Sequence, residues 1–181
     1  MSETHGYRLR IELQEIQPPI WRTVCVPGDL TLGELHILIQ LAMGWYNYHL
    51  HHFMHKGKII GEPDPEFEMI DEKDVYVSDI FKKKGSSIQY EYDFGDSWRH
   101  EIRFIERMKK GDRLFQVIDG ARACPPEDCG GVMGYYELLE AFSDEESPEY
   151  EELMDWLGED FDPDTFDLEE ANRRVQKGVK N

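Results

Sequence analysis

Basic residues are scarce in this 181-residue chain, which carries 20 Lys and Arg against 38 Asp and Glu, a net charge of −18 at pH 7. The deficit is local, because residues 123–172 contain 18 acidic residues and no Lys or Arg. Nucleic-acid affinity comes largely from Lys and Arg that displace counterions from phosphates. The sequence therefore predicts no direct binding of DNA or RNA, and it favours a basic protein as partner. An acidic surface that only keeps the protein soluble is the alternative interpretation.

Long apolar runs and a disulfide pattern are also missing. No apolar stretch is long enough to cross a bilayer and the N-terminus has no apolar leader, so we expect a cytoplasmic protein without membrane contact. Three cysteines do not form a disulfide framework. Apolar residues make up 40% of the chain and predict a packed core. We expect one domain over residues 1–181, with a sheet-and-helix core over 5–120 and a Cys-Pro loop with acidic helices over 121–181.

Two strands and one helix are the best-defined elements. Alternating apolar residues predict strands at 7–14 and 20–26 that pair antiparallel. Thr31 is a good N-cap and Glu34 completes a capping box, which predicts a helix over residues 32–43. The helix should cross the two strands through the apolar residues that recur at helical spacing, Leu35, Leu38, Ile39 and Ala42.

The remaining pattern predicts a sheet followed by helices. Further strands are expected at residues 49–55, 58–60, 75–77, 88–94, 98–104 and 114–118, and helices at 78–81, 135–142, 148–157 and 168–175. This order indicates an α+β fold: a β-grasp-like mixed sheet crossed by one helix, with a C-terminal acidic helical elaboration.

A hairpin around Gly95 concentrates titratable side chains. Apolar residues alternate up to Phe94, and Gly95-Asp96-Ser97 supplies a turn before the strand resumes at Trp98. Asp and Ser are good turn formers, so a structural role is one interpretation. General acid–base chemistry is the other, and its candidate catalytic residues are Asp93, Asp96, His100 and Glu101.

Histidines and cysteines offer candidate ligands for a divalent metal such as zinc. His49, His51 and His55 alternate along one predicted strand, so their imidazoles can share a face. The thiols in Cys124-Pro-Pro-Glu-Asp-Cys129 are separated by four residues, and the interpretation that we prefer for this segment is a proline-stiffened loop with two incidental thiols. The candidate metal ligands are His49, His51, His100, Cys124 and Cys129.

The candidate histidines and carboxylates are also expected to lie close together in the fold. Neighbouring strands lie about 5 Å apart, so side chains on one face can reach a common ion. We expect the loop from Cys124 to Cys129 to border one partly open cleft that holds His49, His51, Asp93, Asp96 and His100. Arg22, in the middle of an apolar strand, is expected to pair with an inward carboxylate.

Four motifs in this order resemble the plasmid pRiA4b ORF-three-like family. They are Pro19-Ile-Trp-Arg-Thr-Val24, His49-Leu-His-His-Phe53, Tyr90-Glu-Tyr-Asp-Phe-Gly-Asp-Ser-Trp-Arg-His100 and Cys124-Pro-Pro-Glu-Asp-Cys-Gly-Gly131 with Gly134-Tyr135. The resemblance covers nearly the whole chain. It implies an α+β domain of bacteria and archaea, associated with plasmids or transposons and without an established biochemical activity. The motif positions are Trp21, Arg22, His49, His51, Asp93, Gly95, Asp96, Trp98, His100, Cys124, Pro125, Pro126, Glu127, Asp128, Gly130, Gly131 and Tyr135.

Some members of that family carry the label of a transposon resolvase. A serine resolvase needs an active-site serine among arginines and a DNA-binding helix-turn-helix, and this sequence shows neither. The sequence favours a non-enzymatic protein-interaction or accessory module. A metal-dependent hydrolase with a His, Asp and Cys site is the alternative, in which Asp93 or Asp96 acts as general base.

Overall fold

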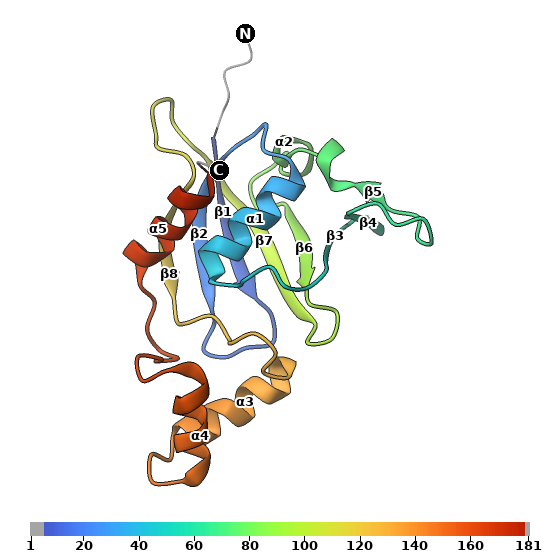
Figure 1. The fold of residues 1–181 in the computed structure, drawn as a ribbon. Helices are drawn as coiled ribbons and strands as arrows, with labels where there is room; N and C mark the ends of the chain where they lie inside the picture. Colours follow the sequence, from blue (N-terminus) through green and yellow to red (C-terminus); the bar gives the residue numbers. More distant parts are fainter. Residues whose placement is uncertain (1–5, 180–181) are drawn as a thin grey trace.

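An eight-stranded sheet forms the centre of the molecule, in the order β5-β4-β3-β6-β7-β1-β2-β8 (Figure 1). The structure, a computed structural model, describes residues 6–179, so residues 1–5 and 180–181 of the predicted domain lie outside the described residues. Neighbouring strands pair antiparallel except β4 and β5, which are parallel. The strands are β1 (Gly6–Leu13), β2 (Trp21–Pro27), β3 (His51–His55), β4 (Lys58–Gly61), β5 (Ile70–Asp71), β6 (Ser87–Tyr92), β7 (Trp98–Arg107) and β8 (Gln116–Ala121).

Helices cover one face of this sheet and one of its ends. Two of them, α1 and α5, lie side by side across the same face, while α3 and α4 lie at the end of the sheet (Figure 1). The helices are α1 (Leu32–Met43), α2 (Val77–Ile80), α3 (Gly131–Phe142), α4 (Pro148–Leu157) and α5 (Leu168–Val179), with a 3-10 turn η1 at Glu72–Asp74. Within residues 6–179 no helix has the length and apolar character needed to cross a membrane.

The predicted pairing of β1 with β2 and the predicted helix α1 are confirmed. The capping box is formed, because the Thr31 hydroxyl accepts from the Glu34 N–H and the Glu34 carboxylate accepts from the Thr31 N–H. Gly44 ends the helix in the left-handed conformation, with φ of 108°. The four apolar residues expected to face the sheet are all buried: Leu35, Leu38, Ile39 and Ala42.

Helix α5 is hydrogen-bonded to both the sheet and α1. The Asn172 side chain donates to the Val117 carbonyl at 2.8 Å and accepts from the Val117 N–H at 3.0 Å, so it continues the hydrogen bonding of β8. Arg174 donates to the Leu41 carbonyl at 2.9 Å. Ala171 and Val175 are fully buried. The sequence places this helix in the acidic C-terminal part. In the structure its apolar residues Ala171 and Val175 belong to the hydrophobic core.

The opposite face of the central strands carries charged side chains that pair with one another. Alternation places these residues opposite the buried apolar set of β1 and β7. Four of the arginines on or beside this face lie within ion-pair distance of glutamates: Arg8 with Glu106, Arg10 with Glu12, Arg99 with Glu15 and Arg103 with Glu101.

Several element boundaries differ from the predictions. The strand expected at 75–77 is one bridge between Tyr76 and Thr31, and the helical turn expected at 78–81 is α2, which begins one residue earlier with Tyr76 as its N-cap. The hairpin turn opens at Asp93, where φ is +59°, so Phe94 leaves the alternation and is 48% exposed. The α+β class is confirmed, and the finer β-grasp-like description stays a prediction.

Candidate functional site

The turn between β6 and β7 fixes the orientation of one buried carboxylate. Asp93 adopts a left-handed conformation, which Asp tolerates better than most residues. Its Oδ1 accepts from the backbone N–H of Gly95 at 2.9 Å and of Asp96 at 3.3 Å. These hydrogen bonds hold the side chain, which is 8% exposed, and leave Oδ2 for other partners.

The segment Ala123–Gly131, here called the Cys-Pro loop, lies directly against this turn. The Gly130 N–H donates to Asp96 Oδ2 at 3.2 Å. Gly131 has φ of +69°, and a Cβ added to it would lie 2.5 Å from the Asp96 carbonyl oxygen. Only glycine permits this close approach without a shift of the backbone. The contact brings the acidic pair in the middle of the loop, Glu127 and Asp128, next to Asp93.

His49 completes a cluster of ligand-type atoms, here called the His49 cluster. Its Nε2 lies 3.0 Å from Asp128 Oδ1, 3.5 Å from Asp93 Oδ2 and 3.9 Å from Glu127 Oε2. One ligand atom from each of His49, Asp93 and Asp128 lies within 4.8 Å of the others. The Nε2 atom is buried, yet its contacts do not have hydrogen-bond geometry. An imidazole nitrogen thus points among three carboxylates without a hydrogen-bond partner.

Glu127 is held in place by neighbours on two other elements. Its Oε1 accepts from the Tyr92 hydroxyl at 3.0 Å and from the Tyr46 N–H at 2.7 Å. Burial, with the nearby Glu127 carboxylate, raises the pKa of Tyr92. The Tyr92 hydroxyl therefore keeps its proton and acts as a donor, so that Glu127 presents a fixed negative charge on the His49 side.

His51 lies in a neighbouring environment rather than in the His49 cluster. Its ring stacks on that of His36 with centroids 3.4 Å apart, and its Nε2 lies 2.8 Å from Glu72 Oε2. Burial, with a smaller contribution from His51, lowers the pKa of His36 to about 3, so this ring is neutral at physiological pH. His36, His49, His51 and Glu72 line one open cavity of about 700 Å³. The His49 cluster therefore lies at the edge of a cavity.

Two of the predicted catalytic residues lie away from this site. His100 is fully buried because it alternates with Trp98 and Ile102 on the helix-covered face of β7. Its Nδ1 donates to the Trp98 carbonyl at 2.9 Å, and burial lowers its pKa to about 4. Glu101 points to the opposite face, where Arg103 donates to it. The predicted residues are thus divided between the His49 cluster, the adjacent cavity, the core and the opposite face of the sheet.

The two loop cysteines are free thiols outside the cluster. Burial raises the pKa of Cys124, and it raises the pKa of Cys129 to about 12, so both side chains are neutral near pH 7. Within residues 6–179, the group of side chains with ligand atoms close enough to share a metal ion contains no cysteine. The cysteines flank the acidic pair of the loop in the sequence.

Sequence reasoning did not identify every residue at this site. Glu127 and Asp128 entered only as motif positions, although two acids enclosed by prolines and cysteines could have marked them as ligands. His36 and Glu72 carried no signal, because one lies within a predicted helix and the other within an acidic stretch expected to be a loop. Only the fold brings them to His51.

Comparison with known proteins places this α+β architecture in a family. The profile described as plasmid pRiA4b ORF-3-like protein matches residues 5–170. The chain is 36% identical over 174 residues to the uncharacterized protein y4hQ of Sinorhizobium fredii, covering 93% of this chain and 89% of that protein. It also resembles the crystal structure of a protein of unknown function, MM3350 from Methanosarcina mazei Go1, with 39% identity and a TM-score of 0.82 over 92% of this chain and 97% of that chain. The protein belongs to the plasmid pRiA4b ORF-3-like family.

Proposed function

We propose that the protein binds one divalent metal ion at the His49 cluster. The observation that carries the proposal is the buried Nε2 of His49, which points among carboxylates without making a hydrogen bond. The three carboxylates around this imidazole repel each other, most strongly between the two that are buried, Asp93 and Glu127. A bound cation relieves this repulsion and gives the imidazole nitrogen a partner.

The donor atoms suit a borderline or hard metal ion. Imidazole nitrogen with carboxylate oxygens is a ligand set used for zinc, manganese and ferrous iron. Nitrogen and oxygen ligands at about 2.1 Å from a tetrahedral zinc ion lie about 3.4 Å from one another. The 3.0 Å and 3.5 Å separations of His49 Nε2 from Asp128 and Asp93 are close to that value.

The surroundings support a catalytic rather than a structural metal. Structural zinc sites are closed by four protein ligands, whereas catalytic sites keep a position for water. The Asp128 side chain is 68% exposed, so solvent reaches one side of the cluster. The cavity of about 700 Å³ that His49 also lines offers room for a substrate. We therefore propose metal-dependent hydrolysis, in which the ion would supply an activated water and Asp93 acts as a ligand.

Metal content tests this proposal. Protein purified without chelator is analysed for metals, and metal-stripped protein is titrated with Zn²⁺ and Mn²⁺ by calorimetry. We expect about one ion per chain in the wild type and a loss of at least tenfold in affinity in His49→Ala and Asp93→Asn. His55→Ala, at the end of β3 and outside the cluster, is the matched control. Equal binding by His49→Ala and the wild type would contradict the assignment.

A protein-interaction role is the second candidate, and the acidic segment favours it. Of the 18 acidic residues in 123–172, all except Glu127 and Glu170 are exposed. Few bases neutralise them, since Arg122 pairs with Asp164 and Arg173 with Glu170. Such a surface steers a basic protein partner toward the molecule.

Peptides of opposite charge test the interaction role. A fluorescein-labelled peptide of alternating Lys and Gly should raise its anisotropy on binding and be released by 0.5 M NaCl. The matched peptide of alternating Glu and Gly should not bind. No binding of the Lys peptide at low salt would exclude this role.

A further inference from the structure

A groove between the Cys-Pro loop and the end of α4 combines exposed aromatic rings with a carboxylate. This hollow of about 300 Å³, here called the Trp156 groove, is lined in part by Glu127, which also lies beside His49. Its lining includes Tyr46, Pro125, Glu127, Trp156 and Phe161. It joins three segments that are distant in the sequence.

The aromatic side chains of this groove are unusually open to solvent. Trp156 is 54% exposed and Tyr46 is 69% exposed, and the Tyr46 ring stacks on that of Tyr48. Large exposed aromatic groups are a typical feature of binding surfaces. Indole and phenol rings attract cations to their faces, and Trp does so most strongly.

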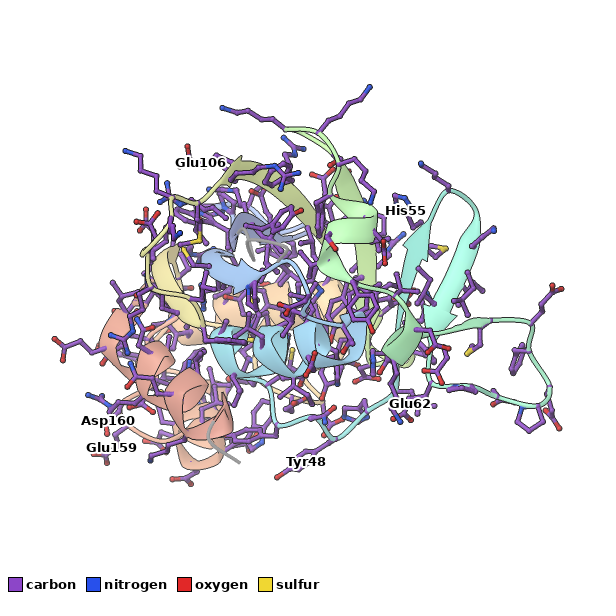
Figure 2. All side chains as sticks on the ribbon, turned by 90° about the horizontal axis from the view of Figure 1, so that it is seen from above. Tyr48, His55, Glu62, Glu106, Glu159 and Asp160 are labelled. Atoms are coloured by element: carbon purple, nitrogen blue, oxygen red, sulfur yellow. The ribbon has the colours of Figure 1, made fainter. Side chains whose placement is uncertain are left out.

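The charge around the groove is negative. Glu127 is the charged residue among the lining residues. Asp155 is adjacent to Trp156, and Glu152 lies one helical turn before it, both exposed. Glu159 and Asp160 follow the helix and lie at the periphery of the molecule (Figure 2).

Two bases lie near this region, and both are already engaged. The buried Arg22, which interacts electrostatically with Cys124 of the groove lining, donates to three backbone carbonyls. Gly44 borders the groove, and a guanidinium nitrogen of Arg174 lies 3.6 Å from the position that a Cβ would occupy at Gly44. Its guanidinium donates to the Leu41 carbonyl and lies 3.7 Å from Glu170. Arg174 therefore serves the end of α1 and a neighbouring carboxylate, and the groove keeps its negative surroundings.

We propose that the Trp156 groove binds a lysine or arginine side chain from a basic segment of a partner protein. The cation lies against Trp156 and Tyr46 with Glu127 as counter-charge, and the alkyl stem packs on Pro125 and Leu157. The inference rests on the proposed interaction role and deepens it, because it names the surface and the group that it recognises. It shares Glu127 with the surroundings of the proposed metal site, whereas Trp156 lies only at the groove.

Substitution at the groove tests the assignment with the full chain. The probe is the fluorescein-labelled peptide of alternating Lys and Gly, measured by anisotropy at 50 mM NaCl. We expect Trp156→Ala to weaken binding about tenfold, the effect of one cation–π contact of about 1.4 kcal/mol. Met133→Ala is the matched control, since Met133 is 77% exposed on α3 and lies outside the groove lining. It should bind as the wild type does.

Each outcome supports or overturns the proposal. If the peptide binds the wild type and Trp156→Ala equally, the acidic surface binds without the groove, and the groove assignment is wrong while the interaction role stands. If the peptide binds neither the wild type nor Trp156→Ala, both the groove assignment and the interaction role are wrong. A Trp156→Ala variant that changes from dimer to monomer in ultracentrifugation, with peptide binding unaltered, assigns the groove to a second copy instead. Unchanged circular dichroism in both variants confirms that they fold.

Discussion

Arg22 is a charged residue that backbone carbonyls, rather than a carboxylate, hold in the core. The expected carboxylate partner is absent within residues 6–179, and the buried guanidinium donates instead to carbonyl oxygens of Ala42, Trp21 and Ala121. Its planar group also stacks on Phe166, 3.9 Å from the ring centre. Burial lowers the pKa of Arg22 to about 10, so it stays charged. It joins the end of α1 to β2 and β8.

Removal of this guanidinium should therefore destabilise the fold. We expect Arg22→Met to lower the free energy of unfolding by about 3 kcal/mol, because buried carbonyl groups lose their donors. Arg99→Met is the control, since Arg99 is 54% exposed and its pairing with Glu15 is worth at most about 1 kcal/mol. Urea denaturation measures both values. Equal stability of the two variants would refute the role assigned to Arg22.

His100 makes stability depend on pH in a defined direction. Its pKa is about 4 in the native protein, against an unfolded value of 6.5. Between these values the unfolded chain binds a proton that the native site does not, so stability falls as pH drops below 6.5. The contribution lost between pH 7.5 and pH 5 is about 2 kcal/mol, at about 1.4 kcal/mol per pH unit.

The variant His100→Phe should reduce this slope. Its unfolding free energy at pH 7.5 falls because the Trp98 carbonyl loses a donor, but it should decline less than that of the wild type on acidification to pH 5. Urea denaturation at both pH values gives the comparison. If the unfolding free energy of both proteins decreased by the same amount between pH 7.5 and pH 5, His100 would not be the titrating group.

Elements with local signals were predicted well, and contacts between distant segments were not. The capping box at Thr31 and the apolar spacing of α1 are local, so the sequence located that helix correctly. The hairpin turn was shifted because Asp93 takes a left-handed conformation stabilised by its own side chain. The meeting of Asp128 with His49 depends on the path of a loop that returns across the sheet end, which no local pattern specifies.

The Cys-Pro loop offers a test at the level of one element. A side chain at Gly131 would collide with the Asp96 carbonyl at 2.5 Å and push the loop away from the hairpin turn. We expect Gly131→Ala to weaken metal binding at least tenfold by moving Asp128 away from Asp93. Gly57→Ala is the matched control, because Gly57 also has positive φ but nothing within 4 Å of its Cβ position. If both variants bind metal as the wild type does, the loop does not position the ligands.

The whole molecule separates its charges into a paired face and an acidic end. The arginines of the open sheet face lie beside glutamates, so this face is close to neutral despite its basic residues. The uncompensated charge lies in residues 123–172, around α3 and α4. Such a distribution directs a cationic partner to the same end of the molecule that holds the His49 cluster and the Trp156 groove.

The same distribution predicts that the protein does not bind nucleic acid at physiological salt. Binding would require several unpaired Lys or Arg on one surface to release counterions from phosphates. The four paired arginines would first have to exchange their carboxylates for phosphates, the exposed lysines at 82–84 form one short run, and the acidic end repels the remaining backbone. A gel-shift assay at 150 mM NaCl should show no retention of a 30-base-pair duplex at micromolar protein. Arg8→Ala and Arg103→Ala should leave that result unchanged, whereas submicromolar, salt-sensitive retention of the duplex would show that the paired arginines are available to phosphates.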